Sequence, residues 1–310
     1  MGRGAHTQQE GPLGSPLRAG QTKGIVPQRR ALIAARKERA RERDAARVRL
    51  AEELAQRARY SIPRDRGFLI IPAGGLAGAA GLIKATNEVI DSVGHERLLT
   101  GDTKGGFIAR GFLPDDARTL GSPYMRFALD EDVIGSIAAY LGVVPVLTVV
   151  NGFYSVHGPN ALKSSQLWHL DPADTTQIKV WVHCSDVGPE SGPLTIVDAT
   201  TSDQFADRIG YRYDSGRYRV GDDEIRDLVG EDRIVPLEGP RGTVAFVDTS
   251  MCFHFGSRVS AGAPPRRMVM FQYLTPYAFE FISDHREEAP FRSLATAGSS
   301  ELERLVLGAA

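Results

Sequence analysis

The sequence is poor in several features that would point to particular classes of protein. It has two cysteines, Cys184 and Cys252, in 310 residues. They form no C-x-x-C pair, so a zinc ribbon or a thioredoxin-like site has no support. Free thiols are typical of a reducing compartment. No apolar run reaches the roughly 20 residues of a membrane-spanning helix, and the first residues lack the apolar segment of a secretory signal. We therefore expect a cytoplasmic protein without membrane contact.

Motifs of two common enzyme classes are also missing. The sequence has no G-x-S-x-G, so hydrolase chemistry of that kind has no support. The glycine-rich stretch AGGLAGAAG at 73–81 is not followed by Lys-Ser or Lys-Thr and contains no G-x-G-x-x-G. It is therefore not interpreted as a phosphate-binding loop.

Positive charge is concentrated at the start of a nearly neutral chain. Residues 1–60 carry 14 Lys and Arg against 6 Asp and Glu, whereas the whole chain carries 37 against 38. A basic arm of this kind can contact nucleic acid or a partner, but a solvated arm is the simpler interpretation. The remainder is acidic, which disfavours a nucleic acid or another large polyanion as a ligand.

The N-terminal part divides by composition. Residues 1–27 are rich in Gly, Pro and Gln, and we expect no fixed structure there. Residues 28–60 have high helix propensity but only a thin, broken apolar stripe, which indicates a surface helix or a detachable arm. We expect residues 61–144 to form a helical N-terminal part of the folded domain, with a short strand at 67–72. Helices are expected at 76–94 and at 130–141, the second capped by Asp130.

From residue 145 the pattern changes to short β-rich runs bounded by Gly, Pro, Asp or Asn. The expected strands are 145–155, 165–170, 177–185, 193–198, 232–237, 243–249, 252–259 and 267–274. Eight such strands after a helical part predict a mainly β fold, a double-stranded β-helix or jelly roll, with N-terminal helices packed on it. This core spans 145–280. A polar insertion at about 200–231, with a helix at 222–230, covers one end, and 281–310 form a tail or helix.

The strongest chemical signal is QLWHLDP at 166–172. His169 and Asp171 stand two residues apart, so on a strand their side chains point to one face and can meet one ion. His254 lies 85 residues later in another expected strand that can pair beside the first. Two histidines and one carboxylate form the facial triad of iron(II) oxygenases, which leaves coordination positions open. Taken alone, H-x-D is equally compatible with a structural histidine beside an aspartate.

A candidate anion site follows the distal histidine. Arg266 stands 12 residues after His254, at the entry to the last strand. A guanidinium is a planar, two-pronged donor suited to a carboxylate, such as the far end of 2-oxoglutarate. Arg267 faces the other side of the strand because side chains alternate. Arg258 is a third candidate, and all three are also compatible with a solvated rim.

With these motifs in place, residues 145–280 resemble the phytanoyl-CoA dioxygenase-like family of Fe(II)/2-oxoglutarate-dependent oxygenases. The matching segments are SQLWHLDP (165–172), IKVWVHCSDV (178–187), SGPL (191–194), GTVAFVDTSMCFHFGSR (242–258) and RRMVMFQYL (266–274). The resemblance implies that His169, Asp171 and His254 bind iron and act in catalysis, and that Arg266 binds 2-oxoglutarate. It also implies that O₂ and 2-oxoglutarate are consumed, that succinate and CO₂ are released, and that ascorbate supports activity.

The same resemblance implies hydroxylation of a small molecule, because related halogenases lack the carboxylate ligand that Asp171 supplies. Desaturation or ring closure stays open. So do two other functions: a cupin-like metalloenzyme that does not use 2-oxoglutarate, and a non-catalytic jelly-roll binding protein tethered by its basic N-terminal helix. The segments 1–60 and 200–231 have no counterpart, so the substrate cannot be inferred.

Several further residues are secondary candidates. Ser257 and Lys179 are candidates for contact with the cosubstrate, although a local turn and a solvent-facing position, respectively, are alternatives. Trp168 is expected in the core. Asn151, Tyr154 and Gln166 are guesses for the mouth of the site, whereas His157 and His183 are interpreted as structural and His285 as exposed.

Overall fold

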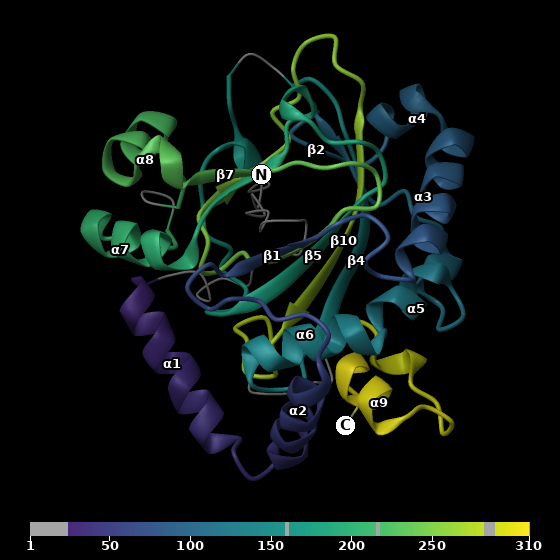
Figure 1. Cartoon of the computed structure of the whole chain (residues 1–310), viewed down its shortest axis with the longest axis vertical. Helices are drawn as coiled ribbons and strands as arrows, with labels where there is room; N and C mark the ends of the chain where they lie inside the picture. Colours follow the sequence, from purple (N-terminus) through teal and green to yellow (C-terminus); the bar gives the residue numbers. More distant parts are fainter. Residues whose placement is uncertain (1–23, 159–160, 215–217, 282–288, 310) are drawn as a thin grey trace, which may run out of the picture.

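The computed structural model describes residues 24–158, 161–214, 218–281 and 289–309, so His285 lies outside the described residues. Two antiparallel sheets form the centre of the molecule (Figure 1). The larger has the order β1 (Phe68–Ile71), β8 (Val244–Asp248), β5 (Gln177–His183), β10 (Arg266–Leu274), β4 (Val146–Ser155), β3 (Ile108–Ala109) and β2 (Thr103–Lys104). The smaller has the order β7 (Ile234–Leu237), β6 (Leu194–Val197) and β9 (His254–Phe255). The fold is the expected jelly roll with helices packed on it.

Helices surround the sheets, as Figure 1 shows. In chain order they are α1 (Val26–Arg39), α2 (Ala45–Arg57), α3 (Ala79–Val93), α4 (His95–Thr100), α5 (Pro123–Ala128), α6 (Glu131–Leu141), α7 (Ala199–Ile209), α8 (Asp222–Val229) and α9 (Glu301–Leu307). The expected helix 130–141 is α6, and the Asp130 carboxylate accepts hydrogen bonds from the backbone N–H groups of Asp132 and Val133. This is the N-terminal cap that the sequence predicts.

Side chains alternate along the central strands, so the two faces of the larger sheet contribute to two separate apolar clusters. On β5, Val180 and Val182 face the helices and pack in the largest apolar cluster. Trp181, between them, belongs to a second cluster with Leu194 and Met268, which lies between the two sheets. Because side chains alternate along a strand, Lys179 lies on the same interior face as Trp181, and it is 2 % exposed. The β5 strand therefore delivers a charged side chain into the barrel.

The structure differs from the sequence expectation in two strands. Residues 165–170 form no regular strand; a 3₁₀ turn, Ser164–Gln166, is followed by isolated β-bridges. The expected strand 252–259 is reduced to the two residues of β9. The short strands β2 and β3 were not expected, because a two-residue strand has no periodicity to detect. These irregular segments lie at the end of the barrel that carries the candidate site.

The N-terminal helices also differ from the expectation of one surface helix or detachable arm over 28–60. Two helices, α1 and α2, pack on the body, and Ala51 and Leu54 belong to the main core. Arg29 and Arg47 are each 1 % exposed. The Arg47 guanidinium donates to the carbonyl oxygens of Val144 and Leu305 at 2.9 and 2.8 Å. Buried arginines satisfied by carbonyl groups fill positions that a hydrophobic pattern counts as exposed.

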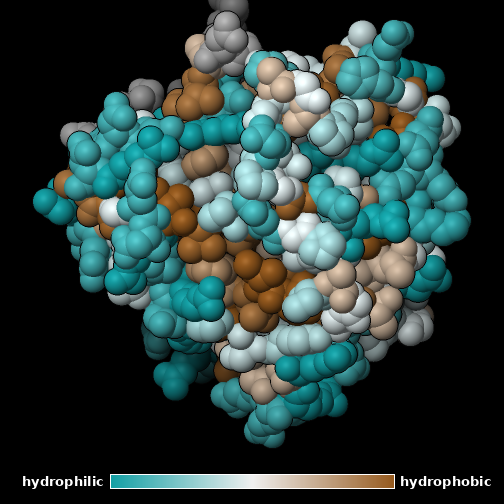
Figure 2. Space-filling model, turned by 45° about the horizontal axis from the view of Figure 1, so that its top comes forward, coloured by the Kyte–Doolittle hydropathy of each residue, from teal (hydrophilic) through white to brown (hydrophobic). Residues whose placement is uncertain are grey.

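No helix in the described part of the chain has both the length and the apolar character needed to cross a membrane. Figure 2 shows one face on which apolar side chains gather in the middle and hydrophilic side chains surround them. That face is therefore amphipathic.

Candidate metal centre and adjoining cavity

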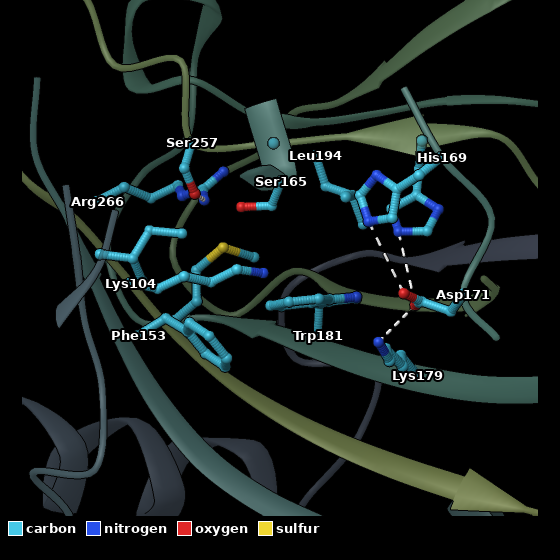
Figure 3. Close-up of a pocket in the computed structure, with 14 residues that line it drawn as sticks. Lys104, Phe153, Ser165, His169, Asp171, Lys179, Trp181, Leu194, Ser257 and Arg266 are labelled. Carbon is cyan, nitrogen blue, oxygen red and sulfur yellow. Dashed lines mark hydrogen bonds and ion pairs between the residues drawn. The ribbon is translucent and has the colours of Figure 1, made fainter. Parts of the chain in front are cut away.

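His169, Asp171 and His254 come together inside the barrel. One ligand atom from each residue lies within 4.8 Å of the other two, and all three side chains are buried. His169 Nε2 is 3.7 Å from Asp171 Oδ1, and His254 Nε2 is 3.6 Å from Asp171 Oδ2. The two imidazole rings have a centroid separation of 4.3 Å. Two nitrogen atoms and a carboxylate thus converge on one point, as Figure 3 shows.

Backbone pairing brings these distant residues together. His169 and His254 form an antiparallel β-bridge, with N–H···O distances of 3.1 and 3.0 Å in the two directions. Two residues later the Asp171 N–H donates to Thr249 O at 2.8 Å. The local extended conformation therefore puts His169 and Asp171 on one side, although the segment forms no regular strand.

Each histidine is held in one orientation by its own backbone. His169 Nδ1 faces Leu167 O at 2.8 Å, and His254 Nδ1 faces Cys252 O at 2.9 Å. A carbonyl oxygen only accepts, so each Nδ1 carries a proton and each Nε2 offers a lone pair to the centre. Burial lowers the pKa of His254 to about 4 and the pKa of His169 well below its usual value. Both rings are therefore neutral near pH 7, the form that binds a metal.

Asp171 is ionised and only partly satisfied. Burial alone would raise its pKa, but the Lys179 ammonium and the neighbouring His254 lower that pKa to about 2. Lys179 Nζ lies 2.5 Å from Oδ2. The other oxygen, Oδ1, accepts no hydrogen bond within the described part of the chain. A buried carboxylate oxygen without a donor is costly, and a cation at the centre of the triad would satisfy it.

A cavity extends from the triad to Arg266. Its lining includes Lys104, Ile108, Phe153, Ser165, Lys179, Trp181, Leu194, Ser257, Arg266 and Met268, together with the three candidate ligands. In Figure 3 the triad lies at one end, and Arg266 with Ser257 lies at the other. The structure thus brings six of the sequence-predicted residues to a single cavity: the three candidate metal ligands, Lys179, Ser257 and Arg266.

Arg266 is buried and has no carboxylate partner among the described residues. Its guanidinium donates to Gly192 O and, at 2.6 Å, to Ser257 Oγ. Its Nε–H has no acceptor in the described part of the chain. Burial lowers the Arg266 pKa to about 10, so the group remains charged near neutral pH. Ser257 has a φ of 63°, a conformation that is uncommon for a residue other than glycine.

The two alternative arginines are engaged elsewhere. Arg258 forms hydrogen bonds with both carboxylate oxygens of Asp222, each at 2.8 Å. Arg267 reaches Asp91 Oδ1 at 2.8 Å on the outer side of β10. Of the three candidates, Arg266 is the one that lines the cavity.

Lys104 is a cavity residue that no sequence motif indicates. It is 4 % exposed, and its Nζ has no hydrogen-bond partner in the described part of the chain. Burial is the main cause that lowers its pKa to about 7. Figure 3 shows it extending into the cavity between Arg266 and the triad. It stands on the two-residue strand β2, for which no sequence pattern exists.

The remaining secondary candidates lie as follows. Lys179 points into the barrel toward Asp171 rather than to solvent. Trp168 packs on Phe255 in the core, with ring centroids 4.6 Å apart. Asn151 accepts a hydrogen bond from the Gly111 N–H, Tyr154 contacts His95, and neither residue lines the cavity. Gln166 is buried beside Ser257 O, and His157 binds Val259 O.

No protein-family model matches the chain, and no curated protein matches it. Among solved structures, the epimerase SnoN in complex with Fe3+, alpha ketoglutarate and nogalamycin RO is 20% identical, with a TM-score of 0.46 over 74% of this chain and 85% of that chain. EctD from S. alaskensis with 2-oxoglutarate and 5-hydroxyectoine is 17% identical, with a TM-score of 0.45 over 78% and 83%. HygX from Streptomyces hygroscopicus with nickel and 2-oxoglutarate bound is 16% identical, with a TM-score of 0.42 over 68% and 83%. At this distance, what the site does has to be inferred from its own residues.

Proposed function

We propose that this protein is an Fe(II)/2-oxoglutarate-dependent dioxygenase that hydroxylates a small organic substrate, with release of succinate and CO₂. The observation that carries the proposal is that one buried cavity has a His₂-carboxylate triad at one end and, at the other, an arginine with no carboxylate partner among the described residues. The first suits a metal with open coordination positions, and the second suits a carboxylate.

The donor set fits iron(II). His169, Asp171 and His254 supply two nitrogen atoms and one oxygen atom, which leaves room for a chelating cosubstrate and O₂. A structural zinc site would instead have four protein ligands. When bound, the metal would supply the oxygen-activating chemistry. The protein's part is to keep both histidines neutral through burial, to turn each Nε2 toward the centre through the carbonyl contacts, and to keep Asp171 ionised through Lys179.

The other end of the cavity fits a dicarboxylic acid. Arg266 and the Ser257 hydroxyl offer a charged fork and a neutral donor for the far carboxylate of 2-oxoglutarate. Lys104 adds a second buried nitrogen without a partner, and the Ser165 hydroxyl and the Trp181 Nε1–H also lack partners in the described part of the chain. Buried donors without acceptors are unfavourable, so this cavity favours a ligand rich in acceptor oxygens.

The assignment to one particular family of these oxygenases rests on the sequence motifs. The order SQLWHLDP, then GTVAFVDTSMCFHFGSR, then RRMVMFQYL supports a relationship with the phytanoyl-CoA dioxygenase-like family. Asp171 supports hydroxylation, since the carboxylate occupies the position that halogenases of this kind leave free for chloride. Apolar side chains such as Phe153, Leu194 and Met268 line the cavity and exclude water from it.

The test is to incubate the purified protein with Fe(II), 2-oxoglutarate, ascorbate and O₂ and to measure succinate. Uncoupled turnover without the true substrate is expected to give succinate, and calorimetry is expected to show 2-oxoglutarate binding that depends on the metal. Metal binding without 2-oxoglutarate binding would favour a cupin-like metalloenzyme. Binding of neither would favour a non-catalytic jelly-roll protein.

A further inference from the structure

A segment of the insertion between β6 and β7 lies against the metal centre. Trp168 and Val220 pair through a β-bridge, and the Tyr211 hydroxyl accepts from the Leu170 N–H at 3.1 Å and donates to Tyr218 O at 2.9 Å. The ring centroid of Tyr218 is 6.0 Å from that of His169. These contacts attach Tyr218 and its neighbours to the H-x-D segment itself.

This segment presents a cation and a hydroxyl that lack acceptors. Arg219 Cζ lies 4.4 Å from the centroid of the Tyr218 ring. Arg219 Nη1 and the Tyr218 hydroxyl are both buried and have no hydrogen-bond partner in the described part of the chain. Arg219 therefore presents an N–H group without an acceptor on the segment whose Tyr218 ring lies against His169.

The summed charge of the side chains around the site, the metal and the cosubstrate is positive. The cations that line the cavity are Lys104, Lys179 and Arg266. Arg219 and Arg110 act on Lys104, and Arg110 pairs with Asp102. The carboxylates that act on Lys179 are Asp171 and Glu280. A divalent metal and dianionic 2-oxoglutarate add no net charge. Lys179 pairs with Asp171, and Arg266 is the expected partner of 2-oxoglutarate, so Arg219 is a charge that neither ligand neutralises.

We propose, on the basis of the proposed function, that the substrate carries an oxyanionic group that binds to Arg219 and the Tyr218 hydroxyl beside His169. The carboxylate, sulfate or phosphate of the substrate would form the hydrogen bonds that these two groups lack. A guanidinium and a phenol hydroxyl together donate to one oxyanion as a charged and a neutral donor. The insertion that has no counterpart in the family motifs then selects the substrate.

The test uses protein loaded with Zn(II), which is redox-inactive, and with saturating 2-oxoglutarate, which occupies Arg266. Sulfate and benzoate are titrated separately by calorimetry. At least one of them is expected to bind the wild-type protein, and Arg219→Met is expected to weaken that binding by about tenfold or more. Tyr218→Phe is expected to weaken it by roughly threefold, since it removes one neutral hydrogen bond.

The matched control is Arg212→Met. It removes the same charge from the same segment, at an exposed position where Arg212 pairs with Asp214 at 2.8 Å, and it is expected to bind the probes as wild type does. Thermal unfolding checks that each variant is folded. Absence of 2-oxoglutarate binding would overturn the proposed function itself. If 2-oxoglutarate binds and neither probe does, or if Arg219→Met and Arg212→Met behave alike, only this inference fails.

Discussion

Lys179 and Asp171 form a buried ion pair in which the ammonium contacts the Oδ2 atom of the carboxylate, whereas the Oδ1 atom faces His169. The Lys179 Nζ to Asp171 Oδ2 distance is 2.5 Å, and the two side chains are 2 % and 1 % exposed. A carboxylate that is so deeply buried needs a positively charged partner to stay ionised. Lys179 supplies that partner before a metal arrives, and it belongs to the metal centre rather than to the cosubstrate end of the cavity.

The first prediction concerns the removal of this ammonium. Lys179→Met is expected to destabilise the metal-free protein by roughly 3–5 kcal/mol, because it leaves a buried charge uncompensated. Metal binding compensates the same charge, so the rise in Tm on adding Zn(II) is expected to be larger in the variant than in wild type. Thermal unfolding with and without the ion measures both effects. Lys84→Met, at an exposed pair with Glu88, is the control and is expected to change stability by no more than about 1 kcal/mol.

The second prediction uses two adjacent arginines on opposite faces of β10. Arg266→Met is expected to weaken 2-oxoglutarate binding by roughly 2–5 kcal/mol, since it removes the buried partner of a carboxylate. Arg267→Met, which loses only the outer contact with Asp91, is expected to leave the affinity almost unchanged. Calorimetry with the Zn(II)-loaded protein distinguishes the two. An effect confined to Arg267→Met would mean that the anion site has been placed on the wrong face of the strand.

The sequence predicts the parts of this molecule that obey a simple period. Alternation in β5 and β10 locates the interior faces, and Asp130 marks the start of α6. The spacing of His169 and Asp171 predicts that the two side chains share one face, because this needs only a locally extended backbone. It does not need the regular strand at 165–170, which the structure lacks.

What the sequence does not reveal depends on tertiary packing. Lys104 lies on a strand of two residues that exists only because β3 pairs with β4. Arg29 and Arg47 look like surface residues in any hydropathy pattern, and they are buried because backbone carbonyl oxygens from distant segments accept their hydrogen bonds. Arg219 stands in a polar insertion, and only its position beside Tyr218 and His169 makes it notable.

The third prediction is a pH dependence at His183. Burial, followed by the nearby Arg266 charge, lowers its pKa to about 4. The folded value is below the unfolded value, so the unfolded chain takes up the proton first, and stability is lost as pH falls from about 6.5 to 4. This group is expected to contribute roughly 3 kcal/mol of that loss. Denaturant unfolding at pH 7 and pH 4.5 is expected to show a smaller loss in His183→Gln than in wild type, and equal losses would contradict the assignment.

The fourth prediction is that α1 is part of the folded site region. The Arg29 guanidinium donates to Pro172 O, next to Asp171, and stacks on the rings of Tyr213 and Phe279 at 4.2 and 3.9 Å from their centroids. Arg29→Met removes a charged hydrogen bond worth roughly 1.5–3 kcal/mol. It also loosens the segment that carries Tyr218. Its Tm is therefore expected to fall, and limited proteolysis is expected to cleave within residues 24–60 faster than in wild type.

Arg39→Met, at an exposed position in the last turn of the same helix, is the matched control and is expected to behave as wild type does in both measurements. If Arg29→Met retains the wild-type Tm and proteolysis pattern, α1 is held by its other contacts alone, such as the Arg30–Asp203 pair. A rise in Tm on adding Zn(II) and 2-oxoglutarate that is smaller in Arg29→Met than in wild type would instead connect the helix to the ligand-bound site, because ligands stabilise only the state that binds them.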